Sequence, residues 1–510
     1  MKIKDFEHCQ DIIRKDLQSS LRKGDVIRCV KLIETFSEVT LRLNNIKYDQ
    51  TVENSLKEVS TNYIGDVPRK GEINEKLIVL YDQVGTTICL GLQYLRGIIA
   101  AGYDVVYIYE NYRKDISPLL LNVIKSLDIE YKLYGPSTPI YNNGTYSGKI
   151  ISEFINSLNP ARIVVHPSPS EAIGPTVMYS LPHIEKLFIV PGDHHYYAGL
   201  HSADYLIEFR KFGINVSVNE RNIEANKIYV LPYYPIIDEL TDFQGFPIET
   251  KGKIVFASAG ATYKFMGSDI IFQIWKYILS KDNTVVLFMG KPDKSISKFI
   301  KDNDFNNRFL LLGFRKDFVQ CIKNADVLVN SYPVCGALVS QTAAYFEKPI
   351  IAYSEEKEYL FQNITDIFGD DGTKKRFTKN SIEEIFSIID KIVEDGSYRK
   401  ELGHSEKNSL QTELEFNRTL EKILLHHENT VENMDYGNYD KEFMMEKYLF
   451  QQNHWQPTVF VPLILQYGFS FFWKFRFMYK DIIKNPTYVA KFTILYLMIK
   501  FKISIFRKLN

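Results

Sequence analysis

The sequence predicts an α/β protein built from two doubly wound, Rossmann-like domains that face a cleft. Short apolar segments rich in Val, Ile and Tyr alternate with helical stretches over residues 71–235, and the alternation starts again over 236–430. A connector with Pro and Gly, residues 231–252, separates the two series of strands. Continuous apolar strands of this kind are typical of parallel sheets that helices cover on both faces.

The order of the expected elements follows from this alternation. In the first domain we expect strands at 76–82, 104–110, 162–166, 186–190, 204–208 and 227–231. In the second domain we expect strands at 253–258, 284–290, 308–313, 326–330 and 349–353. Residues 1–70 carry apolar residues at helical spacing and predict an N-terminal helical segment. Ligands of doubly wound sheets bind at the carboxyl ends of the strands, so the residues that follow each strand are the first candidates for a site.

The charge of the chain is balanced as a whole but not along its length. The 510 residues hold 62 basic and 62 acidic side chains, so the formal net charge is zero, which argues against a protein that coats nucleic acid or another polyanion. Residues 471–510 hold nine Lys or Arg and one acid, Asp481, which gives +8. The first 470 residues hold the other 53 basic and 61 acidic side chains, which gives −8.

The C-terminal region, residues 431–510, is a connector followed by a basic aromatic tail at 456–510. A helix with Phe, Trp, Ile and Leu on one side and Lys or Arg on the other would lie in the membrane interface. We therefore expect an amphipathic helical tail and a cytoplasmic protein that is peripheral on the inner face of the cell membrane. Helices for oligomerisation or domain packing are the alternative. Pro462 and Gln466 interrupt the apolar run and disfavour a transmembrane span.

The cysteines and the N-terminus agree with a cytoplasmic location. The five cysteines form no C-x-x-C pair and are odd in number, which favours free thiols over a disulfide scaffold or a zinc site. The N-terminal residues lack the apolar run of a secretory signal peptide. We expect no metal and no other cofactor.

Candidate residues follow two strands of the first domain. Gly85 and Thr86 come after the first strand, where backbone N–H groups could bind an anion or a sugar hydroxyl. A tight turn with Thr86 or Thr87 as the helix N-cap is the alternative. His166 follows another strand and either faces the same cleft or is a loop histidine. The turn at Gly85 is neither a P-loop nor G-x-G-x-x-G, so neither NTP hydrolysis nor NAD binding has local support.

The densest group of polar side chains is PGDHHYYAG at 191–199, with Asp193, His194 and His195. Histidine titrates near neutral pH, and a neighbouring carboxylate can orient it as a base. Adjacent histidines do not easily turn the same way, and no H-x-x-x-H or H-E-x-x-H spacing is present, which disfavours a metal site. We predict a catalytic site in this loop; a polar loop that caps a helix is the alternative.

In the second domain the candidates suit a phosphate group. Gly260 and Lys264 follow the first strand, where small residues permit close approach and a compact cation suits a diphosphate. An ordinary surface lysine is the alternative for Lys264. Gly336 and Ser340 would lie at the start of a helix that begins near Leu338, where free N–H groups and the helix dipole favour phosphate.

A family resemblance rests on the second domain. With LLGFRKDF (311–318), NADVLVNSYP (324–333) and KPII (348–351), it resembles nucleotide-sugar glycosyltransferases of the glycosyltransferase-B fold, most of all those of bacterial surface polysaccharides. DHHYYAG is similar to a D-H-x-[YFW]-x-x-G loop in the acceptor-side domain of O-GlcNAc-transferase-like relatives. The resemblance covers residues 75–430 and makes 71–235 the acceptor-side domain and 236–430 the nucleotide-sugar donor-binding domain.

The resemblance also implies roles for single residues. Lys264 and the turn at 336–342, which includes Thr342, would bind the donor diphosphate. Phe314 and Arg315 would flank the nucleotide base, and His194 or His195 would lie near the acceptor hydroxyl. The implied activity moves a sugar from a nucleotide-diphosphate donor to a hydroxyl acceptor, and we expect a lipid-linked oligosaccharide in surface polysaccharide synthesis as that acceptor.

The sequence departs from the family at the donor side. Retaining members carry an E-x7-E pair of carboxylates, but alignment on KPII places Val334 and Thr342 there, and Glu347 stands where a glycine is common. The departure leaves the stereochemistry open. It also motivates one alternative function, a non-catalytic subunit of the same fold that recruits a partner enzyme. A second alternative is a nucleotide-sugar epimerase.

Overall fold

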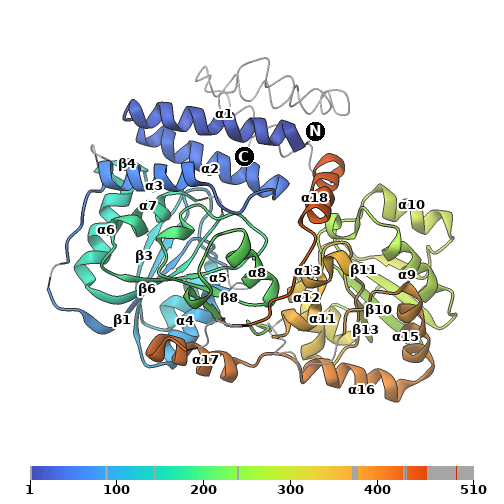
Figure 1. The fold of residues 1–510 in the computed structure, drawn as a ribbon. Coiled ribbons are helices and arrows are strands. Elements are labelled where there is room, and N and C mark those ends of the chain that lie inside the picture. The colour runs from blue at the N-terminus through green and yellow to red at the C-terminus, as the bar shows by residue number, and fades with distance from the viewer. Residues whose placement is uncertain are drawn as a thin grey trace, which may run out of the picture. The chain divides into compact units, whose positions relative to one another are not determined.

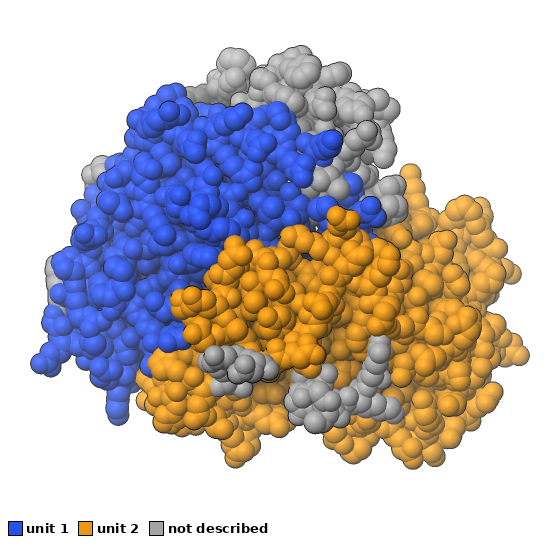
Figure 2. Space-filling view, viewed as in Figure 1, with its two compact units in different colours: residues 1–87, 104–205, 445–510 blue, residues 88–103, 206–444 orange. Residues whose placement is uncertain are grey.

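The computed structural model describes residues 3–69, 71–86, 90–142, 145–169, 171–237, 241–369, 377–428, 431, 434–455 and 490. The chain divides into two compact units, which Figure 2 shows in different colours. The first unit holds residues 1–87, 104–205 and 445–510, and the second holds residues 88–103 and 206–444. Parallel sheets flanked by helices make up the α/β part of the fold (Figure 1).

The chain begins with three helices, as the apolar spacing of residues 1–70 predicts. They are α1 (Ile3–Arg22), α2 (Val26–Leu43) and α3 (Gln50–Tyr63). Aspartate side chains cap two of them: Asp25 accepts the N–H of Arg28 at 3.1 Å, and Asp49 accepts the N–H of Val52 at 3.0 Å. The helices bury their apolar faces, and α1 packs along α2.

The first sheet has seven strands in the order β3-β2-β1-β6-β7-β8-β9. Its strands are β1 (Asn74–Asp82), β2 (Asp104–Glu110), β3 (Glu130–Tyr134), β6 (Pro160–His166), β7 (Glu185–Ile189), β8 (Tyr205–Glu208) and β9 (Ile228–Val230). The strand order reverses between β1 and β6, which pair in parallel so that Asp82 is level with His166. This reversal is the topological switch point at which doubly wound sheets bind ligands.

Helices and short elements connect the strands of the first sheet. They are α4 (Leu90–Ala100), α5 (Pro118–Ser126), α6 (Ser147–Leu158), α7 (Ile173–Ser180), η1 (Leu200–Ser202), α8 (Lys211–Asn219) and η2 (Ala225–Lys227). A small antiparallel pair, β4 (Tyr141–Asn142) and β5 (Thr145–Tyr146), precedes α6. In β1 the side chains from Leu77 to Asp82 are all buried, as the continuous apolar run predicts.

The second sheet has five strands in the order β12-β11-β10-β13-β14. They are β10 (Ile254–Ala259), β11 (Thr284–Met289), β12 (Phe309–Leu311), β13 (Val327–Val329) and β14 (Ile350–Ile351). Here the order reverses between β10 and β13, and the strands pair in parallel. Trp275 is fully buried beside β10, and its indole N–H donates to Ser258 Oγ at 3.0 Å. The five strands lie where the sequence predicts them, within a few residues.

The helices of the second unit complete the fold. They are η3 (Thr262–Phe265), α9 (Ile270–Leu279), α10 (Lys294–Asp302), α11 (Phe318–Asn324), α12 (Ala337–Tyr345), η4 (Glu356–Glu358), α13 (Tyr359–Gln362), α14 (Ile364–Ile367), α15 (Ile382–Glu394), α16 (Gly396–Lys407) and α17 (Glu413–His426). The last helix, α18 (Lys441–Trp455), begins in the second unit and ends in the first. Glu347, after α12, has φ 56°, the left-handed conformation that favours glycine. The glutamate that stands here in place of the family's common glycine therefore has a strained backbone.

The predicted fold class, two doubly wound α/β domains after an N-terminal helical segment, is confirmed. The sequence missed β3, because its residues are exposed or half-buried at the edge of the sheet and do not form a continuous apolar run. The tail at 456–510 lies outside the described residues except for Ala490, so its predicted amphipathic helix stays a prediction. None of the helices in the described part of the chain combines the length and the apolar character needed to cross a membrane. The cleft also stays a prediction.

Candidate functional site

In the first unit, two strand ends meet at a buried, hydrogen-bonded pair of side chains, Asp82 and His166. His166 Nδ1 lies 2.9 Å from Asp82 Oδ1, and the Tyr107 hydroxyl donates to Asp82 Oδ2 at 2.5 Å. Burial opposes ionisation of Asp82, but the adjacent His166 and the hydrogen bond from Tyr107 hold its pKa below the usual value. His166 is completely buried at the end of β6, and its predicted role on the acceptor side stays a prediction. The sequence missed Asp82, although its place as the last residue of an apolar strand could have signalled it.

The turn after β1 is held by the same carboxylate. Asp82 Oδ1 accepts the N–H of Val84 at 2.7 Å and that of Gly85 at 3.2 Å. Gly85 has φ 63°, and a Cβ there would lie 2.3 Å from the Tyr109 ring, so the position requires glycine. The Gly85 N–H is therefore occupied within the protein, and the role of the turn with Thr86 in ligand binding stays a prediction. Thr86 is half-buried beside it.

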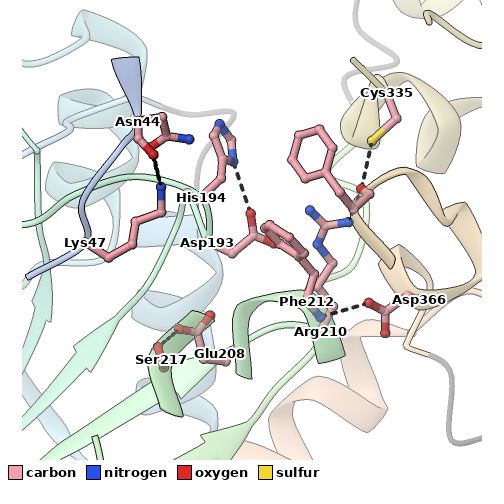
Figure 3. A network of polar contacts seen from close by, with 12 residues as sticks. Asn44, Lys47, Asp193, His194, Glu208, Arg210, Phe212, Ser217, Cys335 and Asp366 are labelled. Carbon is pink, nitrogen blue, oxygen red and sulfur yellow. Dashed lines mark hydrogen bonds and ion pairs between the residues drawn. The ribbon is translucent and has the colours of Figure 1, made fainter. Parts of the chain in front are cut away.

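The 191–199 loop follows β7 and brings Asp193 and His194 together. Asp193 is buried, and its Oδ1 lies 3.1 Å from His194 Nδ1 (Figure 3). Because a carboxylate only accepts hydrogen bonds, His194 Nδ1 carries a proton, and in the neutral ring Nε2 then holds the lone pair. The His194 side chain is 27% exposed, so this nitrogen belongs to a ring that substrate can reach. The arrangement suits a general base.

His195 has a different environment from His194. Its backbone N–H closes the loop onto the Gly192 carbonyl at 2.8 Å, and the Gly192 N–H donates to the Tyr197 hydroxyl at 2.9 Å. The His195 ring lies over Gly192, where a Cβ would come within 2.4 Å of Nδ1. The structure thus separates the two histidines: Asp193 orients His194, and the ring of His195 packs within the loop.

An aromatic residue from far along the chain stacks on His194. The His194 ring meets the edge of the His195 ring with centroids 4.1 Å apart, and it stacks on Tyr448 of α18 at 6.1 Å with 16° between the planes. The sequence did not signal Tyr448, because polar and apolar residues are mixed around α18 without one apolar face. Tyr448 therefore forms part of the surroundings of the candidate base.

In the second unit, the residues after β10 lie against the turn before α12. Gly260 has φ 150°, and the carbonyl of Gly260 approaches Gly290 so closely that a Cβ on Gly290 would lie 2.3 Å from it. Lys264, in η3, is half-buried, and its Nζ donates to the Cys335 carbonyl at 3.3 Å. Burial lowers the pKa of Lys264. The structure therefore brings Lys264 to the segment that the sequence predicts as the second half of the donor site.

The turn before α12 is held by side chains. Asn330 Oδ1 accepts the N–H groups of Ser331 and Gly336, both at 2.9 Å. Gln362 Oε1 accepts the N–H of Cys335 at 2.8 Å. The Gly336 N–H is thus bonded within the protein, and the N–H groups of 337–339 in the first turn of α12 are the ones that suit an anion.

Two predicted hydroxyl ligands bond to their own helix. Ser340 Oγ donates to the Gly336 carbonyl at 2.8 Å, and Thr342 Oγ1 donates to the Leu338 carbonyl at 2.8 Å. Ser340 is fully buried. Ser340 thus lies in the first turns of α12, as predicted, and its hydroxyl is bonded within the helix. The helix begins at Ala337, one residue earlier than predicted.

Phe314 and Arg315 differ in their surroundings. Phe314 is 91% exposed after β12. Arg315 donates to both oxygens of Asp317, at 2.7 and 2.6 Å, and to the Gly245 carbonyl at 3.0 Å. The hydrogen bonds from Arg315 lower the pKa of Asp317 to about 2. Arg315 is therefore held by the fold, and Phe314 is the member of the pair with a ring open to a ligand.

Metal-ligating side chains do not gather into a centre in the parts of the chain that the structure describes. Among those residues, no group of three or more His, Cys, Asp or Glu side chains is arranged to hold a metal ion.

Comparison with known proteins shows the fold. No model of a protein family matches the chain, and no curated protein sequence matches it. Among solved structures, the chain is similar to Alr3699/HepE of Anabaena in complex with UDP and glucose, with a TM-score of 0.51, 13% identity, and coverage of 69% of this chain and 99% of HepE. It is also similar to a mutant of the Thermobaculum terrenum O-GlcNAc transferase, with a TM-score of 0.50, 12% identity, and coverage of 87% of this chain and 85% of that chain. With its two parallel sheets, the chain has the glycosyltransferase-B fold.

Proposed function

We propose that the protein is a glycosyltransferase that moves a sugar from a nucleotide-diphosphate donor to a hydroxyl acceptor. The observation that carries the proposal is the Asp193–His194 pair after β7, with Nδ1 and Oδ1 3.1 Å apart. A buried carboxylate that fixes one imidazole nitrogen leaves the other as a base for a hydroxyl proton. The glycosyltransferase-B fold of the chain supports the same reaction class.

The donor diphosphate is assigned to Lys264 and the first turn of α12. The Lys264 ammonium has three donors, and its bond to the Cys335 carbonyl directs it toward the turn at 330–336. The first-turn N–H groups and the dipole of α12 add favourable interactions with negative charge. Support for a nucleotide diphosphate also comes from the UDP in the HepE structure. The exposed Phe314 ring is assigned to the nucleotide base.

The proposed reaction is a single displacement. His194 Nε2 takes the proton of the acceptor hydroxyl, and the acceptor oxygen forms a bond to the anomeric carbon of the sugar. The bond between that carbon and the diphosphate oxygen breaks, and the electron pair leaves with the nucleoside diphosphate. Lys264 and the N–H groups of 337–339 stabilise the charge that develops on the leaving oxygen. The reaction uses no metal or other cofactor from the protein.

The tail suggests where the acceptor is. Residues 471–510 carry +8 and many aromatic side chains, a composition that suits an anionic membrane surface. We therefore assign the protein to the inner face of the cell membrane as a peripheral protein and a lipid-linked oligosaccharide of surface polysaccharide synthesis as its acceptor.

A panel of nucleotide sugars tests the proposal. The full chain is heated with each donor, because a ligand that binds the folded state raises the apparent melting temperature by mass action. Donors that stabilise the chain are then tested for transfer to lipid extracts. The expected result is at least one donor that both stabilises the chain and loses its sugar to an acceptor. A chain that no donor stabilises would contradict the assignment.

A non-catalytic partner subunit is the second candidate. It is favoured by the absence of both E-x7-E carboxylates from the sequence, and by the Ser340 and Thr342 hydroxyls that bond to their own helix. Such a subunit would bind the donor without consuming it. Transfer by the purified chain alone would exclude this candidate.

A further inference from the structure

A buried carboxylate of the N-terminal helices holds the end of the 191–199 loop. Glu53 lies in α3 with 2% of its surface exposed, and its Oε1 accepts the N–H of Gly199 at 2.7 Å. Its other oxygen, Oε2, accepts the hydroxyl of Tyr179 in α7. The two contacts join α3, α7 and the loop at one side chain.

Gly199 needs this partner because of its own backbone. Its φ is 79°, and a Cβ there would lie 2.4 Å from Pro175. The loop thus ends on a left-handed glycine whose N–H is buried against α3 and α7. A buried N–H without a partner is destabilising, so Glu53 stabilises the conformation in which the Gly199 N–H is bonded.

A second contact from the N-terminal helices holds the middle of the loop. Tyr196 is completely buried, and its ring meets the edge of Phe36 of α2 with centroids 5.7 Å apart. The guanidinium of Arg14, from α1, lies 5.1 Å from the centroid of the same Phe36 ring. All three N-terminal helices therefore support the loop or the ring beneath it.

The catalytic pair of the proposed function, Asp193 and His194, comes directly before these fixed points in the loop. Gly192 and Tyr197 are joined by a hydrogen bond of 2.9 Å, and the segment between them carries Asp193 and His194. The loop continues directly to Tyr196 and Gly199, which the N-terminal helices hold. The orientation of His194 thus depends on anchors outside the loop.

We propose that Glu53 is a positioning residue for sugar transfer, because it fixes the 191–199 loop through Gly199 and so keeps the Asp193–His194 pair in place. The role of the loop in transfer rests on the proposed function. The anchoring itself rests on the contacts of Glu53 alone and is measured without substrate.

The groups around Glu53 determine how it responds to pH. Tyr179 donates to it from α7, and Lys57 and Asp49 act on it through their charges, from α3 and from the residue that caps α3. Tyr48 and Tyr196 lie within its electrostatic reach. Burial raises the pKa of Glu53 to about 7. The carboxylate and the carboxylic acid both accept the Gly199 N–H through Oε1, so the anchor persists across neutral pH.

Hydrogen exchange of the full chain tests the anchor. Glu53→Ala removes both contacts, and we expect amide exchange of residues 193–199 to rise about tenfold or more while exchange in β1 and β6 is unchanged. Glu53→Gln keeps an oxygen for Gly199 and should restore wild-type exchange. Glu58→Ala, at an exposed glutamate of the same helix, is the matched control and should exchange like the wild type. In transfer assays, Glu53→Ala should lower kcat at unchanged KM for the donor.

The outcomes separate the anchor from the proposed reaction. A folded Glu53→Ala chain with wild-type exchange at 193–199 would overturn the inference. So would a loosened loop with wild-type kcat. If Glu53→Ala does not fold, Glu53→Asp is the second variant, because its shorter side chain withdraws the carboxylate from Gly199 by one methylene. Wild-type amide exchange of residues 193–199 in Glu53→Asp would overturn the inference as well. A wild-type chain that transfers no sugar contradicts the proposed function, but the exchange of the loop still tests the anchor.

Discussion

Lys264 Nζ and the carbonyl oxygen of Cys335 lie 3.3 Å apart, although 71 residues separate them in the sequence. The hydrogen bond links the segment after β10 to the turn between β13 and α12. The order of the second sheet reverses between these two strands, β10 and β13. Because this switch point is where doubly wound sheets bind ligands, the pair marks the donor half of the proposed site.

Replacement of Lys264 should reduce turnover with the fold intact. In Lys264→Ala we expect kcat/KM for the donor to fall about a hundredfold or more, since a charge that stabilises the leaving diphosphate is lost. Steady-state assays with circular dichroism as a check on folding measure this. Lys276→Ala, at an exposed lysine of α9, is the control and should keep wild-type turnover. Equal rates in the two variants would remove Lys264 from the mechanism.

The two adjacent histidines should differ in their effect. His194→Ala should lower kcat about a hundredfold to ten-thousandfold, because the proposed base is lost. Asp193→Asn should also lower kcat, because an amide no longer fixes the tautomer of His194. His195→Ala should affect kcat less, since its ring packs within the loop. A His195 variant that is slower than the His194 variant would reverse the assignment.

His166 should matter for stability. His166→Ala leaves the buried Asp82 carboxylate without one of its hydrogen-bond partners, and such a loss costs about 1–3 kcal/mol or more for a charged group. Urea unfolding monitored by circular dichroism measures this loss. His183→Ala, at a half-buried histidine before β7, should cost less. A His166 variant with wild-type stability would show that the pair does not support the sheet.

The stability of the protein should depend on pH through Glu53. The pKa of Glu53 is about 7 in the folded protein, against 4.5 for an unperturbed glutamate, so the folded state binds the extra proton between these values. The contribution of Glu53 to the free energy of unfolding is complete below about pH 4.5, and it is lost as the pH rises through 7 and the buried side chain ionises. The free energy of unfolding of the wild type, relative to Glu53→Gln, should fall by about 3 kcal/mol across this window. Urea titrations at several pH values measure it. A constant difference would contradict the raised pKa.

The tail should control membrane binding. Deletion of residues 456–510 removes the nine basic residues, each of which contributes about 1 kcal/mol near an anionic surface. In sedimentation with phosphatidylserine vesicles, the full chain should bind and the truncated chain should stay in the supernatant. Binding of the full chain should weaken as salt is raised. A truncated chain that still binds the vesicles would contradict the assignment of the tail.

The strands were predictable because burial on both faces leaves a local signal. The continuous apolar runs at 76–82 and 253–258 predict β1 and β10. β3, at Glu130–Tyr134, has no such run because one edge of the sheet is exposed. The reversal of strand order was expected from the fold class, but the register that sets Asp82 beside His166 depends on contacts far apart in the sequence.

The chemistry of the loops was partly predictable. Asp193 and His194 are adjacent in sequence, so their pairing could be proposed from residue types alone. Glu53 and Tyr448 could not be found in this way, because each meets the loop only through the fold. The place of Ser340 near the start of a helix was predictable, but its bond to the Gly336 carbonyl was not, because a hydroxyl there can bond to the preceding turn as readily as to a ligand.

The most direct test of the central claim is transfer by the purified full chain with a panel of nucleotide-diphosphate sugars and a membrane lipid extract. We expect that at least one donor releases its nucleoside diphosphate in step with sugar incorporation, and that His194→Ala and Lys264→Ala abolish most of both. A panel in which the wild type releases no nucleoside diphosphate from any donor would contradict the claim.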